Sequence, residues 1–155
     1  MSPFHAWNDK PIYIVWRGSD KSPIDPLHPA LVSSNAQDPA TWLPWELASE
    51  YARALGAGYG VGVVIHEGSG LLCVDLDKCI EDGAVSGLAV SMVREARRMC
   101  PDVYVEYSMS GKGLHIIGPY SGPPPPHRNK NKELKMELYS KERYIALTGN
   151  LLGPL

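Results

Sequence analysis

Two aspartates two residues apart are the first feature of this sequence that could do chemistry. Asp75 and Asp77 end an apolar run at residues 71–76. Successive residues of a strand alternate between its faces, so both carboxylates lie on one face, about 6.6 Å apart along the strand. Carboxylates at that spacing can converge on one or two hard cations such as Mg²⁺ or Mn²⁺, which prefer oxygen ligands. The alternative is a solvated acidic pair at the end of a strand.

A glycine-containing turn with a histidine behind it is the second feature. The stretch Ser108-Met-Ser-Gly-Lys-Gly-Leu-His115 is flanked by apolar residues. Its glycines let backbone N–H groups approach an anion closely, while Ser110 adds a hydroxyl group and Lys112 a positive charge. His115 alternates away from the apolar face of its strand. The stretch therefore fits a phosphate-binding turn, and the alternative is a tight hairpin with an edge histidine.

An isolated acid on a later strand is the third feature. Glu137 lies between Met136 and Leu138, so it points away from their apolar face. It is either a third carboxylate at the metal or an exposed strand residue. The three features together predict a metal-dependent phosphate-chemistry site on a sheet face. Two metals about 4 Å apart could clamp the attacking and leaving oxygens of a phosphoryl transfer.

The order of three segments carries a family resemblance. DLDKC, EYSMSGKGLHI and MELYSKERYIALTG follow one another within residues 35–150. This arrangement resembles the catalytic domain of primase-polymerases in the archaeo-eukaryotic primase superfamily, in the form found on phages, plasmids and integrated elements. The resemblance implies that Asp75, Asp77 and Glu137 are the catalytic, metal-binding acids. It implies nucleotide binding by Ser108, Ser110, Gly111, Lys112, His115 and Arg143, with the role of Lys112 inferred from its charge.

The function implied by this resemblance is template-directed nucleotidyl transfer, as a DNA primase, a DNA polymerase or both. Its cofactor would be Mg²⁺ or Mn²⁺, and its substrates dNTPs or NTPs with a single-stranded DNA template and a primer. A helicase or accessory domain outside this chain is a further expected partner. Two alternatives stay open: a metal-dependent replication-initiation nuclease that uses the same carboxylates, and a non-catalytic domain that binds single-stranded nucleic acid. A strand-shortening assay separates the nuclease from the polymerase.

Composition and charge exclude several classes of protein. Apolar residues make up 44% of the 155 residues and charged residues 21%, which excludes a disordered or fibrous chain. The net charge of −2 excludes a strongly basic protein that coats duplex DNA. Charge is uneven, however: 7 Lys and Arg stand against 3 Glu from Ser110 onward, and 8 against 14 acids before it. The basic residues Arg128, Lys130, Lys132 and Lys135 are therefore expected to follow a template or primer backbone.

The cysteines and the lack of long apolar runs bear on the compartment. Three cysteines at irregular spacings, without a CxxC pair, argue against structural zinc and favour a reducing cytoplasm. The family resemblance implies that this is the cytoplasm of a prokaryotic or phage-infected cell. Cys73 is expected to be a small core residue. No apolar run approaches the roughly 20 residues that cross a bilayer, so we expect no membrane contact.

The elements that must position these residues follow from periodicity and breakers. The predicted fold is α+β, with an RRM-like, mostly antiparallel sheet and an α/β N-terminal portion. One catalytic domain spans residues 1–155, with an irregular part at 1–37 and a core at 38–150. Helices are expected at 44–55 and 85–99. Strands are expected at 12–16, 61–65, 71–76, 103–107, 114–117, 134–139 and 143–147, with 61–65 and 71–76 forming a hairpin and 121–127 an extended loop.

Overall fold

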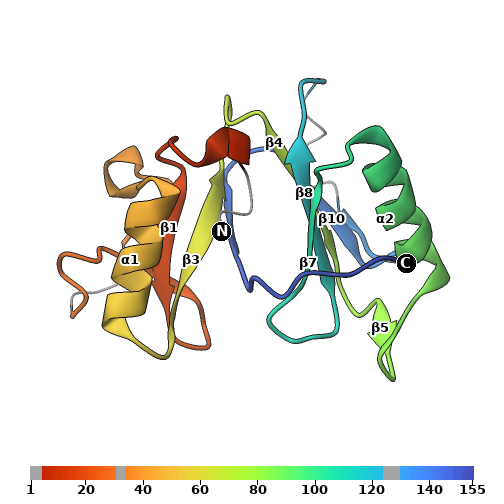
Figure 1. The fold of residues 1–155 in the computed structure, drawn as a ribbon, viewed down its shortest axis with the longest axis horizontal. Helices are drawn as coiled ribbons and strands as arrows, with labels where there is room; N and C mark the ends of the chain where they lie inside the picture. The colour runs from red at the N-terminus through yellow and green to blue at the C-terminus, as the bar shows by residue number, and fades with distance from the viewer. Residues whose placement is uncertain (1–4, 31–33, 124–129) are drawn as a thin grey trace. The chain divides into compact units, whose positions relative to one another are not determined.

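The protein is an α+β fold of two compact units (Figure 1). The structure is a computed structural model that describes residues 5–30, 34–123 and 130–155. The first unit comprises Met1–His66 and Glu142–Leu147, and the second comprises Glu67–Lys141 and Thr148–Leu155. The strands of every pair in the described ranges run antiparallel, which confirms the predicted mixed class with mostly antiparallel sheets.

The first unit is a four-stranded sheet with one α-helix against it. The strand order is β11-β3-β1-β2. Its elements are a 3-10 turn at His5–Trp7, β1 (Tyr13–Arg17), β2 (Ser22–Ile24), a second 3-10 turn at Pro39–Thr41, α1 (Trp45–Leu55), β3 (Tyr59–Ile65) and β11 (Arg143–Ala146). Helix α1 contacts β1 and β3 through a side that buries Ala48 and Ala52, and the Trp45 ring meets the Tyr13 ring edge-on at 5.3 Å. The helix ends at Gly56, whose φ of 94° favours glycine.

Two glycines in β3 make room for aromatic rings. A Cβ on Gly60 would lie 2.2 Å from the Trp16 ring, and one on Gly62 would lie 2.8 Å from the Tyr144 ring. The Trp16 indole donates a hydrogen bond of 3.0 Å to the carbonyl of Val61. These glycines therefore let the rings approach the strand closely, where a larger residue would clash.

The second unit holds all but one of the predicted site residues. Its five-stranded sheet has the order β7-β8-β4-β10-β9. The elements are β4 (Leu71–Leu76), β5 (Ile80–Glu81), β6 (Ala84–Val85), α2 (Gly87–Met99), β7 (Tyr104–Tyr107), β8 (Leu114–Pro119), β9 (Lys130–Asn131) and β10 (Met136–Tyr139). Helix α2 begins after Ser86, whose hydroxyl accepts from the Ala89 amide.

One face of this sheet packs against α2. The buried cluster between them comprises Leu76, Ala89, Val93, Val105, Leu114, Ile116 and Leu152. Val74 packs against the same cluster, so Val74 and Leu76 share the apolar face of β4. Cys73 is fully buried, as predicted for a core residue. Side chains that alternate along the strands with the residues of the α2 cluster must lie on the opposite face of the sheet.

Most predicted elements are present, but the predicted hairpin is wrong. Both helices and every predicted strand appear, with bounds that shift by at most two residues. The short strands β2, β5, β6 and β9 are additional strands that the sequence did not indicate. Strands β3 and β4 do not pair with each other: β3 joins β1 and β11, whereas β4 joins β8 and β10. Apolar alternation shows that a strand has a buried face but does not choose its partner.

Two smaller points complete the comparison. Residues 124–129 lie outside the described residues, so most of the predicted 121–127 loop and Arg128 lie outside them too. None of the helices in the described ranges is long and apolar enough to cross a membrane.

Candidate functional site

Four polar side chains form a row across adjacent strands of the second unit. Glu106 on β7 pairs with His115 on β8, which pairs with Asp75 on β4, which pairs with Glu137 on β10. The backbone of Lys130 on β9 continues the register. Directly opposite residues in antiparallel strands have Cβ atoms about 5 Å apart. The register therefore brings side chains from four separate sequence positions onto one face of the sheet, opposite α2.

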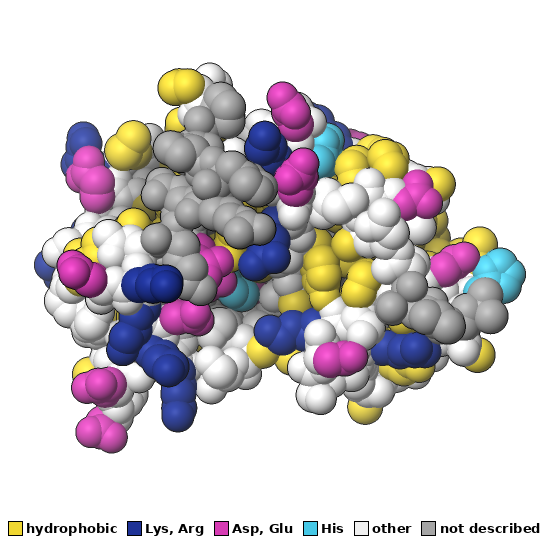
Figure 2. All heavy atoms as spheres, turned by 180° about the vertical axis from the view of Figure 1, so that it is seen from behind, with side chains coloured by type: hydrophobic (Ala, Val, Ile, Leu, Met, Phe, Trp, Pro, Cys, Tyr) yellow, Lys and Arg dark blue, Asp and Glu magenta, His cyan; other side chains and the backbone are white. Residues whose placement is uncertain are grey.

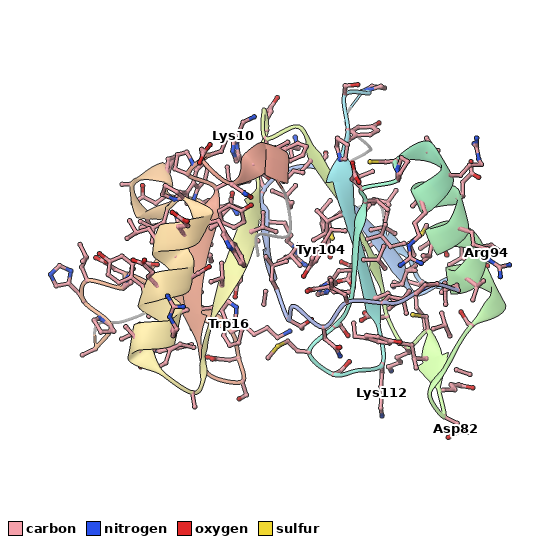
Figure 3. The ribbon with its side chains drawn as sticks, in the orientation of Figure 1. Lys10, Trp16, Asp82, Arg94, Tyr104 and Lys112 are labelled. Carbon is pink, nitrogen blue, oxygen red and sulfur yellow. The ribbon has the colours of Figure 1, made fainter. Side chains whose placement is uncertain are left out.

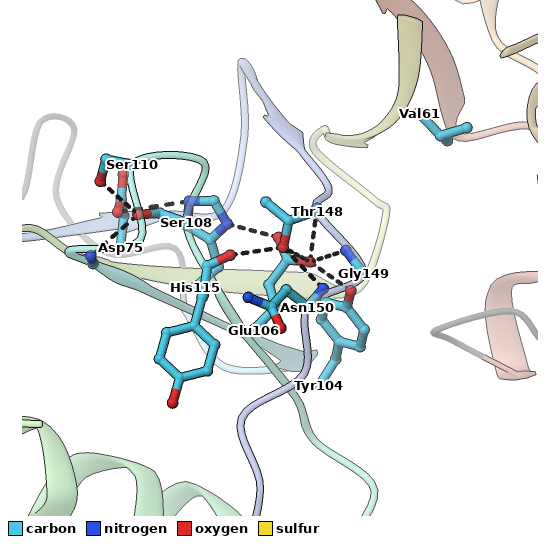
Figure 4. Close-up of polar contacts among 12 residues, drawn as sticks. Val61, Asp75, Tyr104, Glu106, Ser108, Ser110, His115, Thr148, Gly149 and Asn150 are labelled. Atoms are coloured by element: carbon cyan, nitrogen blue, oxygen red, sulfur yellow. Dashed lines mark hydrogen bonds and ion pairs between the residues drawn. The ribbon is translucent and has the colours of Figure 1, made fainter. Parts of the chain in front are cut away.

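Glu106 and His115 form the buried end of this row (Figure 4). The Glu106 side chain is 0% exposed and that of His115 is 9% exposed. The two side chains are joined by a hydrogen bond of 2.9 Å between His115 Nδ1 and Glu106 Oε1. An ionised carboxylate can only accept, so Nδ1 is the donor. The bond thereby fixes the orientation of the imidazole ring.

The second carboxylate oxygen of Glu106 accepts hydrogen bonds from several further donors. Oε2 accepts from the Tyr104 hydroxyl at 2.6 Å and from the backbone amides of Thr148 and Gly149, both at 2.9 Å. The Thr148 hydroxyl lies 3.0 Å from Oε2 and 2.7 Å from the Tyr107 carbonyl. Its single proton serves one acceptor at a time. The segment that follows β11 is thus tied to the middle of β7 through one buried carboxylate.

These bonds keep the buried carboxylate ionised. Burial by itself would raise the pKa of Glu106, but hydrogen bonds from His115, Tyr104 and Gly149 outweigh it, so the net pKa is lowered. Burial raises the pKa of Tyr104, and its hydrogen bond to Glu106 adds to this effect, so the phenol stays protonated and donates. The negative charge of the Glu106 carboxylate is therefore buried on this face of the sheet and surrounded by hydrogen-bond donors.

The other end of the imidazole ring faces Asp75. His115 Nε2 lies 3.9 Å from Asp75 Oδ1, a distance too long for a direct hydrogen bond. The Asp75 side chain is 26% exposed, so it lies between the buried pair and the surface. Glu137 is half-buried on the far side of Asp75. The row thus passes from a closed, hydrogen-bonded end at Glu106 to a more open, acidic end.

The turn between β7 and β8 is held by its serines. The Ser108 and Ser110 hydroxyls lie 3.1 Å apart, the Ser108 hydroxyl accepts from the Gly113 amide, and the Ser110 hydroxyl from the Lys112 amide, both at 3.2 Å. Gly111 has a φ of 71°, which favours glycine. Figure 3 shows Lys112 at the tip of this turn, and its side chain is exposed. Amides, hydroxyls and a cation therefore gather on one short turn, next to the row.

Gly113 joins this turn closely to the end of β4. A Cβ there would lie 2.6 Å from the Leu76 carbonyl oxygen and 3.6 Å from the Asp77 Cα. Asp77 is exposed just beyond β4, and its amide donates to the Lys135 carbonyl at 2.8 Å. Only a residue without a side chain fits between these backbones. The structure thus places the serine turn beside Asp77.

The acids that were predicted to bind metal have the right chemistry but do not form a closed ligand group. Asp75 and Glu137 are neighbours in register, and Asp77 follows two residues along the chain. Their carboxylate oxygens are the ligand type that Mg²⁺ and Mn²⁺ take. Across the described residues, no three His, Cys, Asp or Glu side chains are grouped so that they could hold a metal ion.

Other predicted residues are not members of the row. Arg143 is exposed on β11, in the first unit, and its nucleotide-binding role stays a prediction. Lys132 and Lys135 are exposed. On the face drawn in Figure 2, acidic and basic side chains lie among one another. The predicted backbone contact by the basic stretch stays a prediction.

The sequence analysis missed Glu106, the buried partner of His115, and the residues that donate hydrogen bonds to Glu106. Glu106, Tyr104, Thr148 and Gly149 were given no role, although Glu106 begins the quoted turn segment. A signal existed, because Glu106 and His115 are equally distant from the centre of the turn and would face each other in a hairpin. Thr148 and Gly149 had no such signal, because their contact with Glu106 spans more than forty residues.

Comparisons with known proteins add no family assignment. No protein-family model matches the chain, and no curated protein matches it. The case for a function therefore rests on the residues and their geometry.

Proposed function

We propose that three residues of the row, Glu137, Asp75 and His115, belong to the active site of a metal-dependent nucleotidyltransferase. The enzyme would extend or start a DNA or RNA strand on a single-stranded template. One observation carries the proposal: these three residues lie in register on three adjacent strands, although up to 62 positions separate them in the sequence. They are the same residues to which the primase-polymerase resemblance assigns metal and triphosphate binding. The proposal includes the finer fold assignment, an RRM-like catalytic sheet.

In this proposal the acidic end of the row holds the metal. Asp75, Asp77 and Glu137 would bind Mg²⁺ or Mn²⁺, which supplies charge stabilisation for the attacking and leaving oxygens of phosphoryl transfer. The rigid strands β4 and β10 hold the first and third of these carboxylates at fixed separation. The chain itself therefore contributes placement of oxygen ligands on a sheet face.

The serine turn would receive the triphosphate of a dNTP or NTP. Ser108 and Ser110 present hydroxyls and Lys112 presents one cation within seven residues of His115 on the same hairpin, around the turn at Gly111. Such groups bind anions well when they sit on one short turn. The single-stranded DNA template and the primer are the further substrates of this proposal, and a helicase or accessory domain is a further partner.

Nucleotide binding is the first test, because strand synthesis could require an accessory domain. We expect calorimetry to detect dNTP or NTP binding by the wild-type protein that depends on Mn²⁺. The Asp75→Ala/Asp77→Ala variant should lose this binding. Asp102→Ala is the matched control, since Asp102 is an exposed acid of the same unit, outside the row, and should bind as the wild type does.

Primer extension on a single-stranded template follows if binding is found. Lengthened strands that disappear in the double variant support the proposal. Shortened strands would move the assignment to a metal-dependent nuclease. A well-folded wild-type protein that binds no nucleotide in either condition would contradict the proposal and favour a domain that only binds nucleic acid.

A further inference from the structure

We infer that Glu106 is a positioning residue: it fixes the proton of His115 on Nδ1 and presents Nε2 to the acidic end of the row. This inference gives a role to a residue that the proposed function does not use. It rests on the proposed function only where it concerns nucleotide binding. The orientation of the ring can be tested without any nucleotide.

The bond between the two side chains determines which ring nitrogen carries the proton. Glu106 is fully buried, and its Oε1 lies 2.9 Å from His115 Nδ1. A carboxylate offers only lone pairs, so this geometry requires a proton on Nδ1. In the neutral ring the lone pair must then lie on Nε2, the nitrogen that faces Asp75. A carboxylate that receives the inner N–H of an imidazole commonly sets the tautomer and orientation of that ring.

The Glu106 carboxylate cannot turn within its site. Its other oxygen, Oε2, receives three bonds of 2.6–2.9 Å, from the Tyr104 hydroxyl and the amides of Thr148 and Gly149 (Figure 4). Two of those donors are backbone groups, so they cannot rotate away. The two oxygens therefore have separate roles, because one anchors the carboxylate and the other orients the histidine.

This division of roles predicts what a glutamine would do at position 106. The three donors that converge on Oε2 require an acceptor there, so the amide oxygen of Gln takes that place. The amide NH₂ then occupies the position of Oε1 and points at His115 Nδ1. Two donors cannot share a hydrogen bond, so the neutral ring must move its proton to Nε2. Glu106→Gln is nearly identical in shape and thus reverses the tautomer while keeping the packing.

The ring protonation pattern can be read by NMR. Long-range ¹H–¹⁵N correlations of the His115 ring, assigned with His115→Gln, distinguish Nδ1–H from Nε2–H over a pH range that includes the neutral ring. We expect Nδ1–H in the wild-type protein and Nε2–H in Glu106→Gln. Tyr104→Phe is the matched control: it removes one donor from Oε2, leaves the His115 bond in place, and should keep Nδ1–H.

A double-mutant cycle then tests whether Glu106 acts through the histidine. With Mn²⁺ and a dNTP, Glu106→Gln should weaken binding by roughly tenfold, the lower end of the loss seen when the carboxylate partner of a metal-ligating histidine is removed. In a His115→Ala background the same substitution should have little further effect. An equal loss in both backgrounds would show a merely structural role and overturn the inference.

The outcomes separate this inference from the proposed function. A wild-type neutral ring protonated on Nε2 overturns the inference, and this measurement needs no variant that could fail to fold. A wild-type ring protonated on Nδ1, in a protein that binds no nucleotide, supports the positioning of His115 and contradicts the proposed function.

Discussion

The substitution Glu106→Ala is expected to destabilise the second unit more than any other single truncation in the row. Glu106 is fully buried, so its carboxylate has no access to bulk water. Its removal leaves four buried or partly buried donors without their acceptor. They are the Tyr104 hydroxyl, His115 Nδ1 and the amides of Thr148 and Gly149.

The expected loss is about 3–5 kcal/mol in the free energy of unfolding. An unsatisfied buried polar group costs about 1–3 kcal/mol, and removal of one partner from a buried charged network costs about 3–5 kcal/mol in total. Water that enters the vacated space satisfies some donors, so the costs of the four do not simply add. The loss is still a large part of the roughly 5–15 kcal/mol by which a typical domain is stable.

The assay must report on the correct unit. All four tryptophans, Trp7, Trp16, Trp42 and Trp45, lie in the first unit, so intrinsic fluorescence does not follow the second. Amide hydrogen exchange in β7 and β8 measures the opening of the sheet that contains the row. Glu81→Ala is the matched control, because Glu81 is an exposed acid of the same unit. This substitution should change the free energy of unfolding by no more than about 0.5 kcal/mol.

One result would refute this reasoning. If Glu106→Ala changed the exchange of β7 and β8 amides by less than about 1 kcal/mol, the carboxylate would not be satisfying the donors around it. The interpretation of Oε2 as an anchor would then fail, together with the argument built on Glu106→Gln.

Three further predictions follow from individual contacts. The pKa of Glu106 lies below its ordinary value of 4.5, so the ionised carboxylate contributes stability above that pH, and this contribution is lost as the pH falls through the lowered pKa. In acid titrations, the free energy of unfolding of Glu106→Gln should therefore fall less steeply with decreasing pH than that of the wild-type protein. Gly113→Ala should cost about 1–3 kcal/mol in thermal unfolding, because the new Cβ meets a backbone oxygen at 2.6 Å, whereas Gly87→Ala, with open space around it, should not destabilise. Gly60→Ala should displace the Trp16 ring and shift tryptophan fluorescence to the red; an unchanged spectrum would contradict the close packing of that ring.

Local patterns in the sequence were enough to predict the elements. Apolar residues at helical spacing, closed by Pro101, predicted the helix found at Gly87–Met99. Val74 and Leu76, on either side of Asp75, share the core face, as alternation along a strand requires. These predictions succeed because periodicity and chain breakers act over a few residues, where backbone geometry determines which side chains share a face.

The sequence by itself determined the two helices, the longer strands and the sheet face on which Asp75 and Glu137 lie. Only the tertiary structure decided which strands pair, and therefore that Glu137 stands beside Asp75 and that β3 and β4 enter different sheets. It also decided that Glu106 is a buried anchor, because its burial depends on donors more than forty residues away. Strand partners and buried charges depend on free energies shared between distant segments, and no local spacing encodes them.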